Sequence, residues 1–126
     1  MTKRFAILAV VVVFFVARVP ALAHHGQAAY DNSVPVTVTG TVTEFQFVNP
    51  HCIVYLAVKD ASGETQKWQG ELTSPNRLVR AGWTAHSVQA GDQIALTGWR
   101  AKSGANSLWI TKTVVNGKEL KTAMGA

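Results

Sequence analysis

Three histidines supply the nitrogen atoms in this chain that are best suited to bind a metal ion. His24 and His25 are adjacent in the stretch PALAHHGQAAY at 20–30, and His51 follows an Asn-Pro turn signal. If the chain is cut before His24, the new α-amine and the imidazole of that residue can chelate one ion together. A nitrogen-rich site of this kind favours Cu(II), with Ni(II) or Zn(II) as alternatives. The alternative is that no metal is bound: His24 and His25 then lie on a mobile arm, and His51 hydrogen-bonds to backbone groups of the turn.

The start of the chain predicts the cut that this site requires. Lys3 and Arg4 precede an apolar run at 5–17, which as a helix would span about 20 Å, short of a bilayer core of about 30 Å. Small residues lead up to Ala23, so we expect a secretory signal peptide at 1–23 with cleavage behind it. The protein is then periplasmic or secreted, with no membrane span after cleavage. A retained anchor is the alternative.

The charge of the chain argues against nucleic acid as a partner. Twelve Lys and Arg residues against seven Asp and Glu give a formal net charge of +5. Lys3, Arg4 and Arg18 belong to the expected signal peptide, so the mature chain is only weakly basic. Without a basic surface, binding to a polyanion has little support.

Cys52 is the only cysteine, so no internal disulfide can form in an oxidising compartment. It lies in a strand-like run, which favours a buried, unreactive thiol over a reactive one or an intermolecular bridge.

Strands dominate the chain after an N-terminal arm expected at 24–35. Alternating valine and threonine predict a strand from Val36, with a bend at Gly40 and a bulge near Glu44, where the apolar phase changes. Ser74 suits the N-cap of a short helix and Pro75 its first position. Four more strands and this helix are expected in HCIVYLAV, ETQKWQGEL, AGDQIALTGWRA, SLWITKTVV and SPNRLVRAGW.

The predicted fold class is all-β with one short helix. The order strand, strand, strand, helix, strand, strand matches the five-stranded OB-like Greek-key barrel, here over residues 36–121. A small open β-roll or sandwich is the alternative.

Four further residues are candidates for contact with a ligand or a partner: Glu71, Arg77, Arg80 and Trp83. Glu71 either pairs with one of the arginines at 77, 80 and 100 or lies as a carboxylate beside the metal. Arg77 and Arg80 are three apart on the expected helix and can hold an anionic group, although a solvated helix face is the simpler explanation. The many aromatic residues mostly fill the barrel, and an exposed subset would form a partner surface.

Four stretches of the chain carry a resemblance to a known family: AHHG with AAYD at 23–31, VTVTGTVTEFQFVNPH at 36–51, WQGELTSPNRLVRAGW at 68–83 and GDQIALTGWRAKSGAN at 91–106. The chain resembles a family of small exported bacterial proteins of unknown function. The resemblance implies export and an OB-like fold but no activity. The family pattern includes the paired histidines, the NPH tripeptide, Glu71 and the helix end at 80–83. Cys52 is not part of that pattern.

Catalytic signatures are missing from the sequence: there is no GxSxG, phosphate loop or paired-carboxylate motif. We therefore expect a small periplasmic binding protein, not an enzyme, that holds copper or a similar metal through His24, His25 and His51. The first alternative is an accessory module that docks a periplasmic or envelope protein. The second is a copper-dependent enzyme with an open coordination position.

Overall fold

The structure, a computed structural model, describes residues 26–122. The expected signal peptide at 1–23, together with His24 and His25, lies outside the described residues. A 3-10 helix, η1, is followed by six strands and one α-helix. Their bounds are η1 Gly26–Ala29, β1 Tyr30–Gln46, β2 Ile53–Lys59, β3 Thr65–Glu71, α1 Pro75–Arg80, β4 Gln93–Ala101, β5 Ser107–Val115 and β6 Lys118–Leu120.

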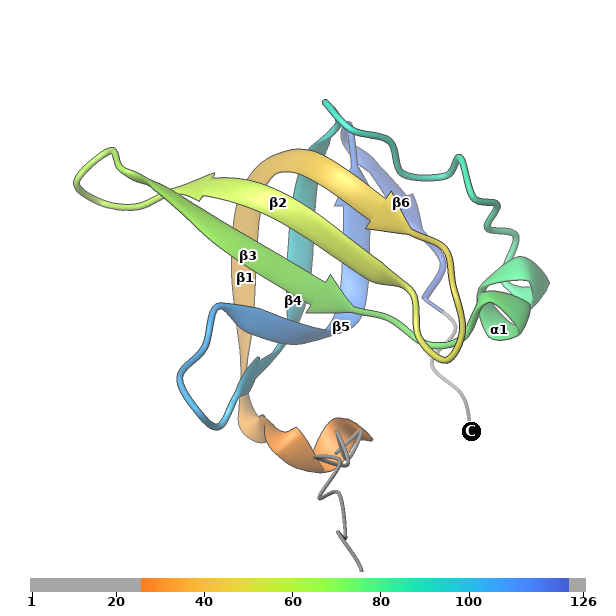
Figure 1. Ribbon diagram of the computed structural model, residues 1–126, viewed down its shortest axis with the longest axis horizontal. Coiled ribbons are helices and arrows are strands. Elements are labelled where there is room, and N and C mark those ends of the chain that lie inside the picture. The colour runs from red at the N-terminus through yellow and green to blue at the C-terminus, as the bar shows by residue number, and fades with distance from the viewer. Residues whose placement is uncertain (1–25, 123–126) are drawn as a thin grey trace, which may run out of the picture.

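Strand pairing closes the sheet into a barrel (Figure 1). The sheet order is β3-β2-β1-β4-β5-β6, and β3 also pairs with β5, in parallel, at Gln69–Glu71. β1 pairs with β4 from Tyr30 to Thr41 and with β2 from Thr41 to Gln46. This is the OB-like Greek-key arrangement with a short helix after the third strand, so the predicted fold class is confirmed. The short β6 extends the sheet beyond β5.

The long strand β1 has the predicted bend and bulge. Its register against β2 shifts between Val42 and Glu44, where the change of apolar phase indicated a bulge. At Gly40 a Cβ atom would overlap the carbonyl oxygen of Ala57. Only glycine lets β1 pass this close to β2 while it curves from one partner strand to the other (Figure 1).

The start of β1 differs from the prediction, because the strand begins at Tyr30 inside the segment expected as an arm. Tyr30 pairs with Ala101 on β4, and the register then shifts between Asp31 and Pro35. The Asp31 carboxylate accepts hydrogen bonds from the Ser33 amide at 3.0 Å and hydroxyl at 2.6 Å. This local irregularity and Pro35 hide the period-two pattern from a sequence analysis.

Aliphatic side chains from β1, β2, β4 and β5 fill the barrel. Cys52 is fully buried beside them, and burial raises the pKa of its thiol more than a hydrogen bond to the Val48 carbonyl lowers it. The predicted burial of Cys52 is therefore confirmed, and the raised pKa disfavours the reactive thiolate. The core comprises Val38, Val42, Cys52, Val54, Leu56, Leu72, Leu78, Trp83, Val88, Ile94, Leu96, Leu108, Ile110 and Val115.

Helix α1 begins at Pro75, as predicted, and packs its buried Leu78 against this core. Ser74 occupies the N-cap position without a side-chain hydrogen bond, and its carbonyl accepts from the Leu78 amide instead. Gly82, with φ +94°, follows the helix end. Within residues 26–122, no helix has the length and apolar character needed to cross a bilayer.

Candidate functional site

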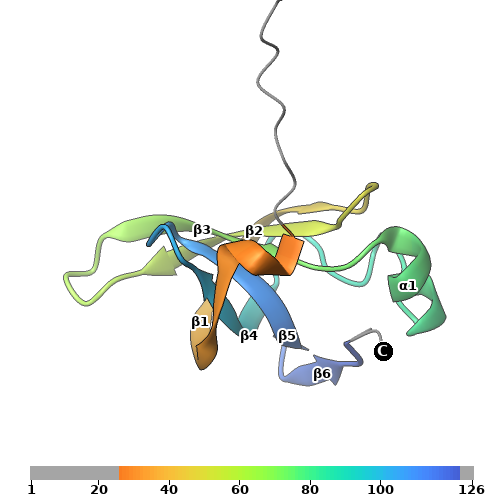
Figure 2. The same ribbon diagram turned by 90° about the horizontal axis from the view of Figure 1, so that it is seen from below.

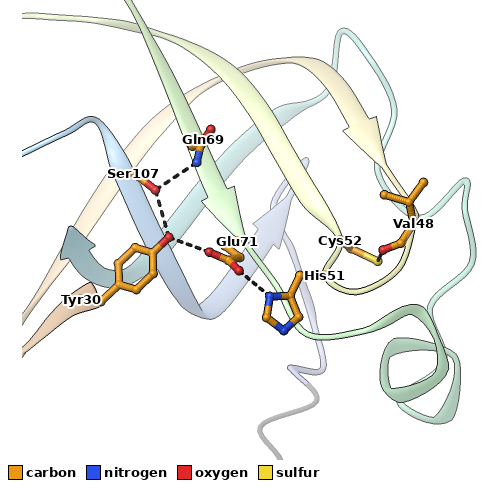
Figure 3. A network of polar contacts seen from close by, with 7 residues as sticks. All are labelled: Tyr30, Val48, His51, Cys52, Gln69, Glu71 and Ser107. Carbon is orange, nitrogen blue, oxygen red and sulfur yellow. Dashed lines mark hydrogen bonds and ion pairs between the residues drawn. The ribbon is translucent and has the colours of Figure 1, made fainter. Parts of the chain in front are cut away.

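A chain of polar side chains links four segments of the molecule (Figure 3). Glu71 is central: its Oε1 lies 2.5 Å from Nδ1 of His51, and its Oε2 accepts a hydrogen bond of 2.7 Å from the Tyr30 hydroxyl. The Tyr30 oxygen lies 3.2 Å from Oγ of Ser107, which accepts a bond of 3.3 Å from the Gln69 amide. Because Tyr30 donates to Glu71, the Ser107 hydroxyl is left to donate to Tyr30.

The β2–β3 ladder brings His51 to Glu71. It continues beyond the regular strands, since the Cys52 amide donates to the Thr73 carbonyl and the Leu72 amide donates to the Cys52 carbonyl. Cys52 and Leu72 point into the core, and side chains alternate along a strand. His51 and Glu71 therefore share the opposite face as diagonal neighbours across the two strands.

Closure of the barrel brings Tyr30 and Ser107 to the end of β3, where Tyr30 contacts Glu71 and Ser107 contacts Gln69. The parallel pairing of β3 with β5 sets Ser107 opposite Gln69 and Trp109 opposite Glu71. Tyr30, the first residue of β1, follows η1, which lies across this end of the barrel (Figure 2). Elements from both ends of the chain thus meet at the end of β3.

Trp109 packs against two members of the network. Its ring centroid lies 5.5 Å from that of His51, nearly edge-on at 82°, and 6.0 Å from that of Tyr30. Tyr30 and Trp109 are less than a tenth exposed, whereas the side chains of His51 and Glu71 are 27% and 19% exposed. The His51–Glu71 pair therefore packs against the Trp109 ring on one side and is partly exposed to solvent, where a ligand can reach it.

The contact with Glu71 determines which nitrogen of His51 is available. A carboxylate beside Nδ1 favours a proton on that nitrogen, which leaves the lone pair on Nε2. In Figure 3 the second ring nitrogen points away from Glu71. A carboxylate that orients an imidazole in this way is typical of metal-binding histidines. Residues 26–122 contain no group of three His, Cys, Asp or Glu side chains that could hold a metal alone.

Two of the predicted site residues, His51 and Glu71, are brought into direct contact. His24 and His25 lie outside the described residues and directly precede Gly26, the first residue of η1. Among the described residues, the expected partners Arg77, Arg80 and Arg100 make no ion pair with Glu71. Arg100, one of the expected partners, instead places its guanidinium 5.1 Å from the ring centroid of Trp68.

The other three candidates lie at or just after α1. Arg77 and Arg80 are exposed on the helix. Trp83 is only 3% exposed, and its indole N–H donates a hydrogen bond of 2.7 Å to the Lys121 carbonyl. The expectation of partner contact at Trp83 does not fit this burial, because the ring packs in the core and its one polar group is already paired.

Tyr30 and Ser107 were not among the residues predicted from the sequence. Tyr30 stood in the segment expected as an arm, although AAYD is one of the stretches that carry the family resemblance. Ser107 is a small polar residue at the start of a strand, and no local pattern marks it. Both join the network through contacts with residues that are far away in the chain.

We expect the protein to lose free energy of unfolding at high pH because of the buried Tyr30 hydroxyl. Burial, together with the hydrogen bond to Glu71 and its negative charge, raises the pKa of Tyr30 to about 12, although the Ser107 hydrogen bond opposes this rise. A raised folded-state pKa contributes stability that is fully present below the unfolded value of about 10 and is lost as the pH rises to about 12. We expect the free energy of unfolding to fall by up to about 2–3 kcal/mol across this window.

Urea unfolding between pH 8 and pH 12 measures this loss. Tyr30→Phe should lack most of the decrease, whereas Tyr55→Phe should retain it. An equal decrease in both variants would contradict the assignment to Tyr30.

Comparisons with known proteins bear on the family and the fold. A family model described as a family of unknown function (DUF6152) matches residues 12–108, a range that includes all three candidate histidines. No curated protein matches the chain. Among solved structures, the crystal structure of a small single-stranded DNA-binding protein from Streptomyces coelicolor is similar with a TM-score of 0.45 and 16% identity. That likeness covers 68% of this chain and 96% of the other.

Proposed function

The chain belongs to the DUF6152 family of unknown function, and we propose that it is an exported, periplasmic or secreted protein that binds a copper ion without catalysing a reaction. The ligands are the α-amine and imidazole of His24, the imidazole of His25 and Nε2 of His51. The observation that supports this most is the 2.5 Å contact between the Glu71 carboxylate and Nδ1 of His51.

The His51–Glu71 pair has the properties of half of a metal site. The carboxylate fixes the ring and makes the opposite nitrogen a better donor, and the side chain of His51 remains 27% exposed. One imidazole alone holds a metal ion weakly, so the site needs further ligands from elsewhere in the chain. Nitrogen ligands in such a set favour Cu(II) among the divalent ions.

The residues before η1 can supply those ligands because the strand that follows η1 begins at Tyr30, which is bonded to the same carboxylate. Tyr30, which donates to Glu71, is separated from His25 only by the four residues of η1. A chain of this length spans at most about 18 Å, which is the upper limit on the distance between Tyr30 and His25. Cleavage after Ala23 would add the α-amine at the same place.

Copper titration of the exported, metal-free protein tests the site. Intact mass should first show that the chain begins at His24, and Cu(II) should then give a paramagnetic resonance spectrum with several nitrogen ligands. In His51→Ala we expect one nitrogen fewer and an affinity lower by about tenfold or more. His86→Ala, which removes an exposed histidine in another loop, should match the wild type.

Two results would overturn the proposal: an unchanged spectrum in His51→Ala, or an exported chain that does not begin at His24. Competition with Zn(II) and Ni(II) decides the metal, and tighter binding of either would replace copper in the assignment.

A docking module is the second candidate function, and helix α1 favours it. Arg77 and Arg80 flank Val79, whose side chain is 56% exposed. In residues 26–122, no ion pair or side-chain hydrogen bond engages either arginine. Such a surface suits an acidic, partly apolar protein partner. Cross-linking in periplasmic extract that is lost in Arg77→Glu/Arg80→Glu, with copper binding unchanged, would favour this function.

A further inference from the structure

Two buried hydroxyl groups lie behind the His51–Glu71 pair. Tyr30 and Ser107 are each only 7% exposed, less than the side chains of His51 and Glu71. A ligand that approaches from solvent reaches the imidazole, and the two hydroxyls act on it through Glu71. We propose that Tyr30, supported by Ser107, is a positioning residue that holds His51 in the form with a proton on Nδ1 and a free lone pair on Nε2. This inference rests on the proposed function, because Nε2 is the proposed copper ligand.

The hydrogen bonds drawn in Figure 3 run in one direction, toward the carboxylate of Glu71. The Gln69 amide donates to Ser107, and the Tyr30 hydroxyl donates to Oε2 of Glu71. Each hydroxyl has one proton to donate, so the Ser107 hydroxyl donates to the Tyr30 oxygen, which lies 3.2 Å away. Hydrogen bonds in such a chain polarise one another, so the donor behind Tyr30 strengthens its bond to Glu71.

The hydrogen bond from Tyr30 determines which partner holds the proton between Glu71 and His51. A hydrogen bond to an ionised carboxylate is roughly twice as strong as one between neutral groups. The Tyr30 hydroxyl therefore favours a carboxylate that accepts from Nδ1–H of His51 over a carboxylic acid that donates to Nδ1. It also occupies Oε2, which leaves Oε1 to face the ring at 2.5 Å. Without this bond, the carboxyl group can rotate and the ring can adopt either tautomer.

Tyr30 also reaches His51 through Trp109, and this second route does not involve the hydroxyl. The ring centroid of Trp109 lies 6.0 Å from that of Tyr30 and 5.5 Å from that of His51. Tyr30→Phe removes the hydroxyl and keeps the ring that packs against Trp109. The variant therefore separates the effect of the hydrogen bond on the imidazole from the aromatic packing at this end of the barrel.

NMR of the isotope-labelled, metal-free protein tests this assignment, because long-range proton–nitrogen couplings show which nitrogen of an imidazole is protonated. His51→Ala identifies the signals of His51, and we expect the proton of the neutral ring on Nδ1. Tyr30→Phe should show both tautomers, whereas Tyr55→Phe, which removes a hydroxyl from β2 outside the network, should match the wild type. Ser107→Ala should have a smaller effect, because Tyr30 still donates to Glu71. A proton on Nε2 in the wild type, or an unchanged tautomer in a folded Tyr30→Phe variant, would overturn the proposal.

Cu(II) titration of the same variants separates this inference from the proposed copper site. Tyr30→Phe should weaken copper binding by about three- to tenfold, less than the removal of Glu71 itself, because it acts one contact further from the metal. Its paramagnetic resonance spectrum should show a wider spread of nitrogen couplings, which a loss of stability alone would not produce. If the wild type binds no copper while Tyr30→Phe still changes the tautomer, the proposed function fails and the effect of Tyr30 on His51 stands. Full copper affinity in a Tyr30→Phe variant with a changed tautomer would overturn the role of Tyr30 in metal binding.

Discussion

Replacing Glu71 with alanine is expected to lower the free energy of unfolding by about 3 kcal/mol and to weaken copper binding by about ten- to a hundredfold. The carboxylate accepts from Tyr30 and contacts Nδ1 of His51, and it is only 19% exposed. Its removal leaves the buried Tyr30 hydroxyl with Ser107 alone and lets the imidazole rotate. Urea unfolding followed by tryptophan fluorescence measures the first effect, and Cu(II) titration measures the second.

Glu64→Ala provides the matched control. Glu64 is an exposed glutamate in the turn between β2 and β3, and its side chain makes no hydrogen bond or ion pair within the described part of the chain. We expect it to change the free energy of unfolding by less than about 0.5 kcal/mol. If Glu71→Ala were equally mild in both measurements, the network would be neither structural nor a support for a metal ligand. Lost stability with unchanged copper affinity would leave Glu71 a structural residue only.

The barrel was predictable because its strands have strong local patterns. Alternating valine and threonine locate β1, and the change of apolar phase near Glu44 locates its bulge. The length of the strand predicts that it bends, and the glycine at position 40 predicts where. The first residues of β1 escaped prediction because the Asp31–Ser33 irregularity interrupts the alternation before Pro35. Local periodicity therefore predicts a strand only as far as its pairing is regular.

The candidate site was predictable residue by residue but not as an arrangement. His51 and Glu71 were both selected by type, yet Glu71 was expected either to pair with an arginine or to lie as a carboxylate beside the metal, and its contact with His51 was not predicted. The contact observed depends on the β2–β3 register, which extends past the strand ends through Cys52 and Leu72. Trp83 was selected for contact with a partner but is buried. The sequence alone does not indicate whether an aromatic residue lies in the core or at the surface.

Tyr30 and Ser107 could not be found from the sequence because the pairing of strands far apart in the chain brings them together. Their oxygens lie 3.2 Å apart although 77 positions separate them in the chain. The β1–β4 and β4–β5 ladders create this contact, since Tyr30 pairs with Ala101 and the neighbouring Arg100 pairs with Leu108. Nothing local in the sequence specifies it. Close packing between β4 and β5 therefore supports both the fold and the candidate site.

Gly98→Ala should be among the most damaging additions of a single methyl group, lowering the free energy of unfolding by about 3 kcal/mol or more. A Cβ atom at this position would overlap the Trp109 carbonyl oxygen and lie 3.0 Å from the Ile110 Cα. These are backbone atoms of the neighbouring strand, and they cannot yield without breaking the β4–β5 ladder. Urea unfolding monitored by far-ultraviolet circular dichroism measures the loss.

Gly70→Ala is the comparison that isolates the backbone clash, because its Cβ would meet side-chain atoms of Ile110 and Leu96. Those side chains can rotate, so we expect a smaller loss of about 1–2 kcal/mol. The reverse order would show that β5 can move away from β4 more easily than the core can repack. Displacing β5 at Trp109 would also move the ring that packs against His51 and Tyr30. We therefore expect the protein that remains folded in Gly98→Ala to have an altered near-ultraviolet circular dichroism spectrum.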